Sequence, residues 1–287
     1  MLSVVTNDYC LFMAIVLSHI SALEFWESIR IVSFYYRDVL YAKKLIREPL
    51  CIAADSSAIP GEVNQPFHCL VAEKELRRFN KDVVCHVWTS PLPKGSVYNI
   101  GRGVYACSPE LCFVQMARNM SLLQLIKLGY ELCGLYTVSE EGLFQAQPLT
   151  TVDKLKSFIS KAGGVRGTKK ASKALQYVRD NSASPMETCL AMLLSLPYRL
   201  GGYGFEKLIL NHPIQTTELT CGVLLPKTYI CDLFWPDAGL AIEYDSDQYH
   251  TKSDQIAHDS IKRTDLGVVG IKVISVACPH FLYQPKC

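Results

Sequence analysis

The sequence predicts an α/β protein, in which an N-terminal α+β module precedes a C-terminal module of order α-β-β-β-α-β with a mixed sheet. Its 287 residues favour about two domains, and 49% hydrophobic residues are enough for a substantial core. Residues 228–245 predict a β-hairpin, because two runs of β-branched, aromatic and aliphatic residues flank a Pro-Asp-Ala-Gly turn. Residues 240–276 then read strand, helix, strand, which is typical of a βαβ unit with parallel strands.

The first module, expected over residues 1–160, combines short strand-like segments with helices. The apolar run 11–20 predicts a buried strand that leads into a helix with Ser21 as its N-cap. A weak signal peptide is the alternative, and the run is too short to span a bilayer. His86 and Trp88 are interpreted as ordinary strand residues. The module shows no catalytic constellation, so we expect it to recognise the target or a protein partner.

Residues 161–183 are expected to form a basic linker between the modules. Lys and Arg greatly outnumber Asp and Glu here, and nucleic-acid phosphates are bound by such cation density. The alternative is a solvated helix–loop–helix that connects two domains. The candidate nucleic-acid-binding residues are Arg166, Lys169, Lys170 and Lys173.

The register of the hairpin follows from its turn. If residues 236–239 form the turn, Trp235 faces Leu240 and, two pairs further on, Leu233 faces Ile242. The next opposed pair consists of two acids, Asp232 and Glu243. A longer or shorter turn would break this opposition.

Two opposed carboxylates on an otherwise apolar β-hairpin predict a compensating cation, because like charges repel and burying them unpaired is costly. Asp232, Glu243 and Asp245 share one face by the alternation of side chains along strands. Their hard oxygen atoms suit Mg²⁺ or Mn²⁺. The alternative is that these acids reach solvent at the edge of the sheet.

Net charge and cysteine content bear on two properties, the mode of nucleic-acid binding and the cellular compartment. A formal net charge of +2 does not indicate nucleic-acid binding by bulk charge, so any basic surface is local. The 12 cysteines form no Cys-x-x-Cys motif and mostly lie in apolar runs, which is typical of buried thiols in a reducing cytoplasm. We therefore expect a cytoplasmic protein without a membrane segment.

Three stretches of the C-terminal module, expected over residues 184–287, carry a resemblance to a known family. They are SPMETCLAMLL, CDLFWPDAGLAIEYDSDQYH and HDSIKRTDLGVVGIKVISV. Their order, with an acid on one strand and E-x-D on the next, resembles the PD-(D/E)XK nuclease superfamily and more closely its very-short-patch-repair-endonuclease-like branch. The resemblance implies a restriction-endonuclease-like fold for this third of the chain.

The resemblance also implies roles for individual acids. Asp232 and Glu243 match the acids that bind the metal, and Glu187 matches the acid of the preceding helix, which helps to hold metal or water. Ser184 and Glu187 also have the spacing of a helix capping box, which explains the glutamate without a site. Asp245 stands where the family usually has a lysine, which makes it a candidate third metal ligand.

Because the motif lysine is absent, the residue that takes its role has to come from elsewhere in the chain. Lys262 or Lys272 would replace it, and His250 would orient water or bind phosphate. We therefore expect a Mg²⁺- or Mn²⁺-dependent DNA endonuclease. The alternatives are a catalytically silent DNA-binding or regulatory protein on the same fold, or an antitoxin-like interaction protein. The candidate catalytic residues are Asp232, Glu243, Asp245, Glu187, His250 and Lys262.

Overall fold

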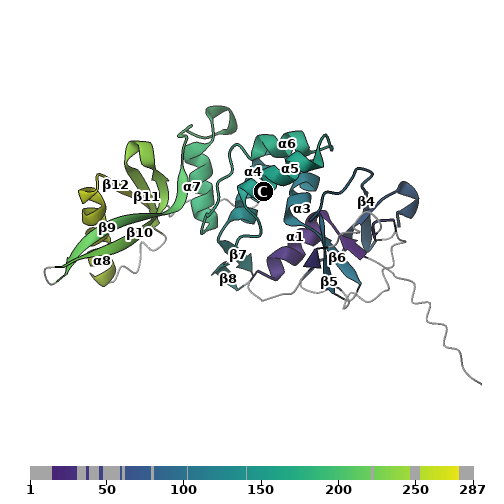
Figure 1. Cartoon of the computed structure of the whole chain (residues 1–287), viewed down its shortest axis with the longest axis horizontal. Coiled ribbons are helices and arrows are strands. Elements are labelled where there is room, and N and C mark those ends of the chain that lie inside the picture. Colours follow the sequence, from purple (N-terminus) through teal and green to yellow (C-terminus); the bar gives the residue numbers. More distant parts are fainter. Residues whose placement is uncertain are drawn as a thin grey trace, which may run out of the picture. The chain divides into compact units, whose positions relative to one another are not determined.

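The structure is a computed structural model, and it describes residues 15–30, 37–38, 45–47, 59, 62–78, 81–101, 103–139, 141–220, 223–245 and 253–277. The described residues fall into two compact units, whose elements are labelled in Figure 1. Unit 1 contains the residues up to 132 together with 149–176, and unit 2 contains 133–148 and the residues from 177 onward. Both units mix helices with sheets, so the predicted α/β class is confirmed.

Among its described residues, unit 1 has a six-stranded mixed sheet in the order β2-β5-β6-β1-β3-β4. β1 lies in the middle of this sheet, parallel to β6 and antiparallel to β3, so the predicted buried strand is confirmed. The strands are β1 (Ile15–Leu17), β2 (Arg37–Asp38), β3 (Phe67–Val71), β4 (Val83–Val87), β5 (Val97–Gly101) and β6 (Val104–Cys107).

Local chemistry accounts for the helices that cover this sheet. Ser108 caps α3 by accepting a hydrogen bond from the backbone N–H of Leu111, and Pro109 occupies the first helical position. The prediction for α1 is wrong in one respect: its N-cap is Ser18, and the Ser21 hydroxyl oxygen instead accepts the N–H of His68 at 2.9 Å. The helices are α1 (His19–Ser28), α3 (Pro109–Met116), α4 (Leu122–Cys133), α5 (Val152–Ala162) and α6 (Thr168–Ala174).

The segment expected to be a basic linker is largely folded. Its residues up to 176 belong to unit 1, and they include α6 and the C-terminal end of α5. Both helices pack against α3 through apolar positions such as Leu155 and Ala171, which are fully buried. The cations between these positions favoured the prediction of a linker. The small and apolar residues of the segment nevertheless have the spacing of an amphipathic helix.

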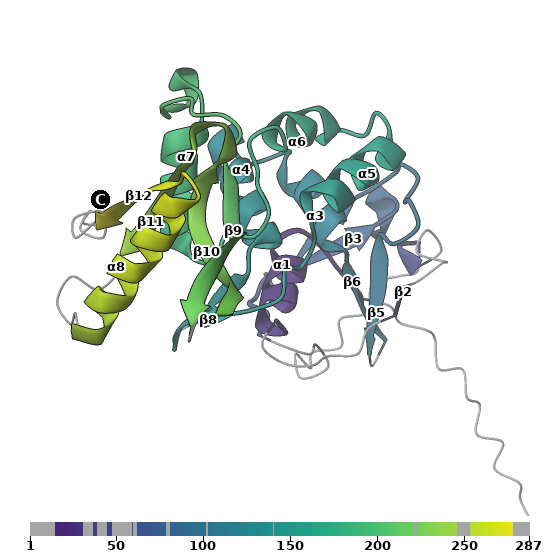
Figure 2. The ribbon, with the colours of Figure 1, turned by 60° about the vertical axis from the view of Figure 1, so that its left-hand side comes forward.

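Unit 2 contains the hairpin, within a four-stranded sheet of order β12-β11-β10-β9. β9 (Ile209–Thr220), β10 (Val223–Trp235) and β11 (Leu240–Asp245) are antiparallel neighbours, and β11 runs parallel to β12 (Lys272–Ala277). α8 (Ser253–Val268) makes the βαβ crossover and lies across one face of the sheet (Figure 2). α7 (Pro185–Ser195) precedes these strands in the chain, so the predicted α-β-β-β-α-β order is confirmed.

A buried cluster joins α8 to the sheet of unit 2. Leu266 of α8 is fully buried against Tyr229, Cys231, Phe234 and Ala241 of β10 and β11. Unit 2 also contains a short hairpin of β7 (Tyr136–Ser139) and β8 (Gly142–Gln145). None of the helices in the part of the chain that the structure describes combines the length and apolar composition needed to cross a bilayer.

Candidate functional site

The predicted register of the hairpin is confirmed. Trp235 pairs with Leu240, Phe234 with Ala241 and Leu233 with Ile242, and Asp232 and Glu243 are the residues that follow these pairs on the two strands. The turn is a short 3-10 segment that ends at Gly239, which has a left-handed φ of 55°. A Cβ atom at Gly239 would lie 2.8 Å from the carbonyl oxygen of Gly270, so the turn needs glycine for both reasons.

β10 is distorted at Asp232. Pairing with β9 continues on both sides of this residue but omits Asp232, and Asn211 of β9 beside it has a left-handed φ of 46°. Cys231 and Phe234 lie in the same buried cluster, although strict alternation would place residues three apart on opposite faces. The Asp232 carboxylate accepts the backbone N–H of Tyr244 at 2.8 Å, so it is held against β11.

The cation that compensates these acids comes from α8. The Lys262 ammonium group donates to Glu243 Oε2 at 2.7 Å and to the carbonyl oxygen of Ile230 at 2.7 Å. The Lys262 side chain is 16% exposed and that of Glu243 is 20% exposed, so the ion pair is largely removed from water. Lys262 therefore joins α8 to both strands of the hairpin.

Burial dominates the electrostatics of the two acids. It raises the pKa of Asp232, against the lowering effects of the Tyr244 N–H and of Lys262. It also raises the pKa of Glu243, where the hydrogen bond from Lys262 lowers the pKa and the Asp232 charge raises it. The two carboxylates thus lie close enough for the Asp232 charge to affect the pKa of Glu243.

The second oxygen of Glu243 has a different environment. Glu243 Oε1 is buried and accepts no hydrogen bond of ordinary geometry from the described residues. The neighbouring Cys231 thiol lowers the pKa of Glu243 slightly, and burial raises the pKa of that thiol to about 12. A buried carboxylate oxygen without a partner is costly, so this atom is suited to receive a ligand.

Glu187 is saturated by hydrogen bonds at the start of α7. It forms the capping box with Ser184, whose hydroxyl donates to Oε1 at 3.1 Å and accepts the N–H of Glu187 at 3.1 Å. Oε2 accepts the N–H of Ala183 at 2.9 Å and the side-chain amide of Asn211 at 2.7 Å. Burial raises the pKa of Glu187, and the Asp232 charge also raises it, so Glu187 lies near Asp232 while its oxygens serve the helix cap.

The other predicted residues are less closely gathered. Asp245 ends β11, two residues beyond Glu243, and pairs in register with Ala277 of β12. Lys272 pairs with Leu240 at the turn end of β11, so Lys262 is the lysine that meets Glu243. His250 lies outside the described residues.

The carboxylates of the hairpin can supply only part of the ligands that Mg²⁺ or Mn²⁺ requires. In the described part of the chain no three His, Cys, Asp or Glu side chains are grouped to hold a metal ion, so Asp232, Glu243 and Asp245 do not form a three-carboxylate cage. Mg²⁺ usually retains several waters and binds one or two carboxylates plus substrate phosphate oxygens. Asp232 and Glu243, with the unpartnered Oε1, fit this lower requirement.

The predicted nucleic-acid-binding cations belong to unit 1. Arg166, Lys169 and Lys173 are exposed, whereas the Lys170 ammonium group donates to the carbonyl oxygen of Met120 at 2.8 Å. Lys170 therefore has a structural contact, and the other three are accessible to solvent.

Sequence reasoning missed a cluster of three histidines in unit 1. His68 Nδ1 lies 2.9 Å from His86 Nε2, and the rings of His19 and His86 stack with centroids 3.6 Å apart. Two histidines at strand positions were the available signal, but only the parallel pairing of β3 with β4 and the position of α1 bring the rings together.

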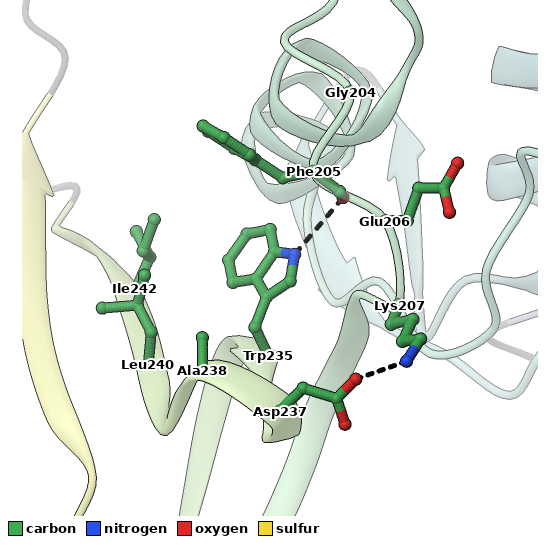
Figure 3. A pocket seen from close by; sticks show the side chains of 9 residues that line it. All are labelled: Gly204, Phe205, Glu206, Lys207, Trp235, Asp237, Ala238, Leu240 and Ile242. Atoms are coloured by element: carbon green, nitrogen blue, oxygen red, sulfur yellow. Dashed lines mark hydrogen bonds and ion pairs between the residues drawn. The ribbon is translucent and has the colours of Figure 1, made fainter.

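A pocket of about 470 Å³ beside the hairpin turn was also not predicted. Figure 3 shows the Trp235 indole in its wall, with its N–H donating to the carbonyl oxygen of Phe205 at 3.3 Å. Lys207 and Asp237 form an exposed ion pair at the rim, and Leu240 adds an apolar wall. The Phe205 side chain is 55% exposed, so this apolar pocket opens beside an exposed aromatic ring.

No family model, no curated protein and no solved structure matches this chain.

Proposed function

We propose that unit 2 hydrolyses DNA phosphodiester bonds with the help of Mg²⁺ or Mn²⁺. The observation that carries this proposal is the contact of Lys262 with Glu243 beside Asp232, on a hairpin of confirmed register. The α-β-β-β-α-β order and the sequence resemblance to the PD-(D/E)XK nucleases support it. Lys262 stands in for the lysine that the E-x-D motif lacks.

Each side chain has a role that follows from its surroundings. Asp232 and Glu243 would hold the ion, with water and phosphate oxygens completing its ligands. When bound, a divalent ion supplies Lewis acidity and lowers the pKa of bound water. The Lys262 ammonium group, already positioned by Glu243 and by the Ile230 carbonyl oxygen, would neutralise charge that builds up on the phosphoryl group. Glu187 would orient Asn211 and the start of α7 rather than bind the ion.

The test is nicking of supercoiled DNA by the purified full chain with Mg²⁺ or Mn²⁺. Asp232→Asn and Glu243→Gln should abolish cleavage, and Lys262→Gln should reduce it by about 100-fold, the usual range for loss of one charge-stabilising group. Asp237→Asn is the matched control, because it removes an exposed carboxylate of the same hairpin. Cleavage by Asp232→Asn at the wild-type rate would refute the assignment.

A second candidate is a catalytically silent DNA-binding or regulatory protein. It is favoured by the same ion pair, because Lys262 already compensates the Glu243 charge without a metal. This candidate predicts salt-dependent DNA binding and no cleavage with either ion. Isothermal titration of the protein with Mn²⁺ distinguishes the two, since only the nuclease requires binding that Asp232→Asn removes.

A further inference from the structure

Unit 1 contains an open pocket of about 390 Å³ in which lysines from separate parts of the chain meet. Lys94 comes from the turn before β5, whereas Lys154 and Lys161 come from α5. Ser157 and Tyr98 add hydroxyl groups to the lining. The pocket thus offers three ammonium groups and two hydroxyls, which are the donors that phosphate oxygens accept.

The helical spacing of α5 explains how one wall forms. Lys154, Ser157, Phe158 and Lys161 are separated by three, one and three residues, so they share one side of the helix. Phe158 is 6% exposed and anchors this side in the core, while both lysines are exposed. The lysines are therefore presented to solvent from a fixed helix.

Two acids also line the pocket, so its lining carries three positive and two negative groups. Glu110 accepts a hydrogen bond from the Thr150 hydroxyl at 2.5 Å, and Asp153 lies 3.8 Å from Lys156, a cation outside the lining. Further exposed cations lie between α5 and α6 and on α6, namely Arg166, Lys169 and Lys173.

We infer that the pocket formed by Lys94, Lys154 and Lys161 binds a backbone phosphate of DNA, and that unit 1 is the DNA-holding unit of this protein. The inference rests on the proposed function for its substrate class, and it adds a site outside the carboxylate hairpin. The exposed cations Arg166, Lys169 and Lys173 belong to the same unit and add to its positive charge. The two acids of the lining disfavour a ligand with closely spaced negative charges, so a single phosphate group fits the pocket best.

The salt dependence of DNA binding provides the test. Each phosphate contact adds about 0.9 to the slope of log K against log salt, which at 0.1 M salt corresponds to about eightfold in affinity. Because the pocket holds one phosphate, the triple variant Lys94→Gln/Lys154→Gln/Lys161→Gln should lower the slope by about 0.9 and bind about eightfold more weakly, and each single variant should lose part of this effect. Lys127→Gln is the matched control, since Lys127 is an exposed lysine of unit 1 on α4, outside the pocket.

Binding is measured by fluorescence anisotropy of a labelled duplex with EDTA present, and all variants carry Asp232→Asn so that cleavage does not interfere. Unchanged affinity and slope in the triple variant would overturn the pocket, even if the wild-type protein cuts DNA. A loss of binding in the triple variant would support the pocket even if no DNA were cut, so the two proposals fail separately. Binding of inorganic phosphate that the triple variant loses, in a protein that does not bind the duplex, would assign the pocket to free phosphate and overturn the DNA inference.

Discussion

The carboxylate hairpin of unit 2 and the histidine cluster of unit 1 bury titratable groups in opposite ways. In the hairpin, Lys262 supplies a full charge at 2.7 Å from Glu243. In the cluster, the rings of His19, His68 and His86 contact one another, and His19 Nδ1 lies 3.1 Å from the hydroxyl oxygen of Ser18. A buried group with a counter-charge can remain charged, whereas a buried group without one is kept neutral.

The histidine pKa values reflect this difference. Burial, with smaller contributions from neighbouring imidazoles and Arg118, lowers the pKa of His19 to about 3 and that of His86 to about 4. All three rings are therefore neutral near pH 7, and the short contact between His68 and His86 requires one ring nitrogen to donate and the other to accept. The comparison shows that proximity of ionisable groups does not by itself indicate a charged site.

The largest change in the free energy of unfolding is expected from replacing Lys262, the cation that pairs with Glu243. Lys262→Met leaves the Glu243 carboxylate and the Ile230 carbonyl oxygen without their donor, which should lower the free energy of unfolding by about 2 to 4 kcal/mol. Urea denaturation at pH 7 measures the loss. Adding Glu243→Gln should restore part of it, because the uncompensated charge is then gone.

Lys227→Met is the control for this prediction. Lys227 pairs with Asp265 in the same unit at 3.4 Å, but the two side chains are 25% and 24% exposed, so the loss should be smaller. If Lys262→Met cost no more than Lys227→Met, the hairpin would not depend on a buried counter-charge.

The next effect concerns pH and unit 1. Because the folded-state pKa of His19 lies far below 6.5, the unfolded chain binds more protons as pH falls below 6.5, and stability is lost between about pH 6.5 and pH 3. His19 alone should cost about 2 kcal/mol of stability between pH 7 and pH 5. The measurement is the free energy of unfolding in urea at each pH.

His19→Asn isolates this contribution, since asparagine tolerates the left-handed φ of 50° at this position and does not titrate in this range. Its stability should decline less steeply with falling pH than that of the wild-type protein. Equal slopes for the two proteins would show that the cluster does not hold His19 neutral.

The smallest effect is expected at Asp232. Burial raises its pKa and its charge raises the pKa of both Glu243 and Glu187, so Asp232→Asn removes a cost of folding. The free energy of unfolding should rise by about 0.5 to 1 kcal/mol at pH 7 while cleavage is lost. A variant that lost both stability and cleavage would instead mark Asp232 as a structural residue, held for its bond to the Tyr244 N–H.

Much of the local structure was predictable from short stretches of sequence. The Pro-Asp-Ala-Gly turn set the register of β10 and β11, and the Ser184 to Glu187 spacing predicted the capping box. The βαβ crossover followed from the order of apolar patterns. The alternative of a helix–loop–helix over the basic segment agrees with the observed helices, whereas the expected linker role is wrong up to residue 176, because buried small residues between the cations pack this part into unit 1.

The sequence by itself determined the α/β class and the pairing of residues 233–235 with residues 240–242, because turn chemistry and side-chain alternation act between near neighbours. Only the tertiary structure decided that Lys262 meets Glu243, that three histidines stack, and that Lys94 joins two lysines of α5. Those contacts depend on how helices cross sheets, and no local pattern specifies which side chains such a crossing brings together.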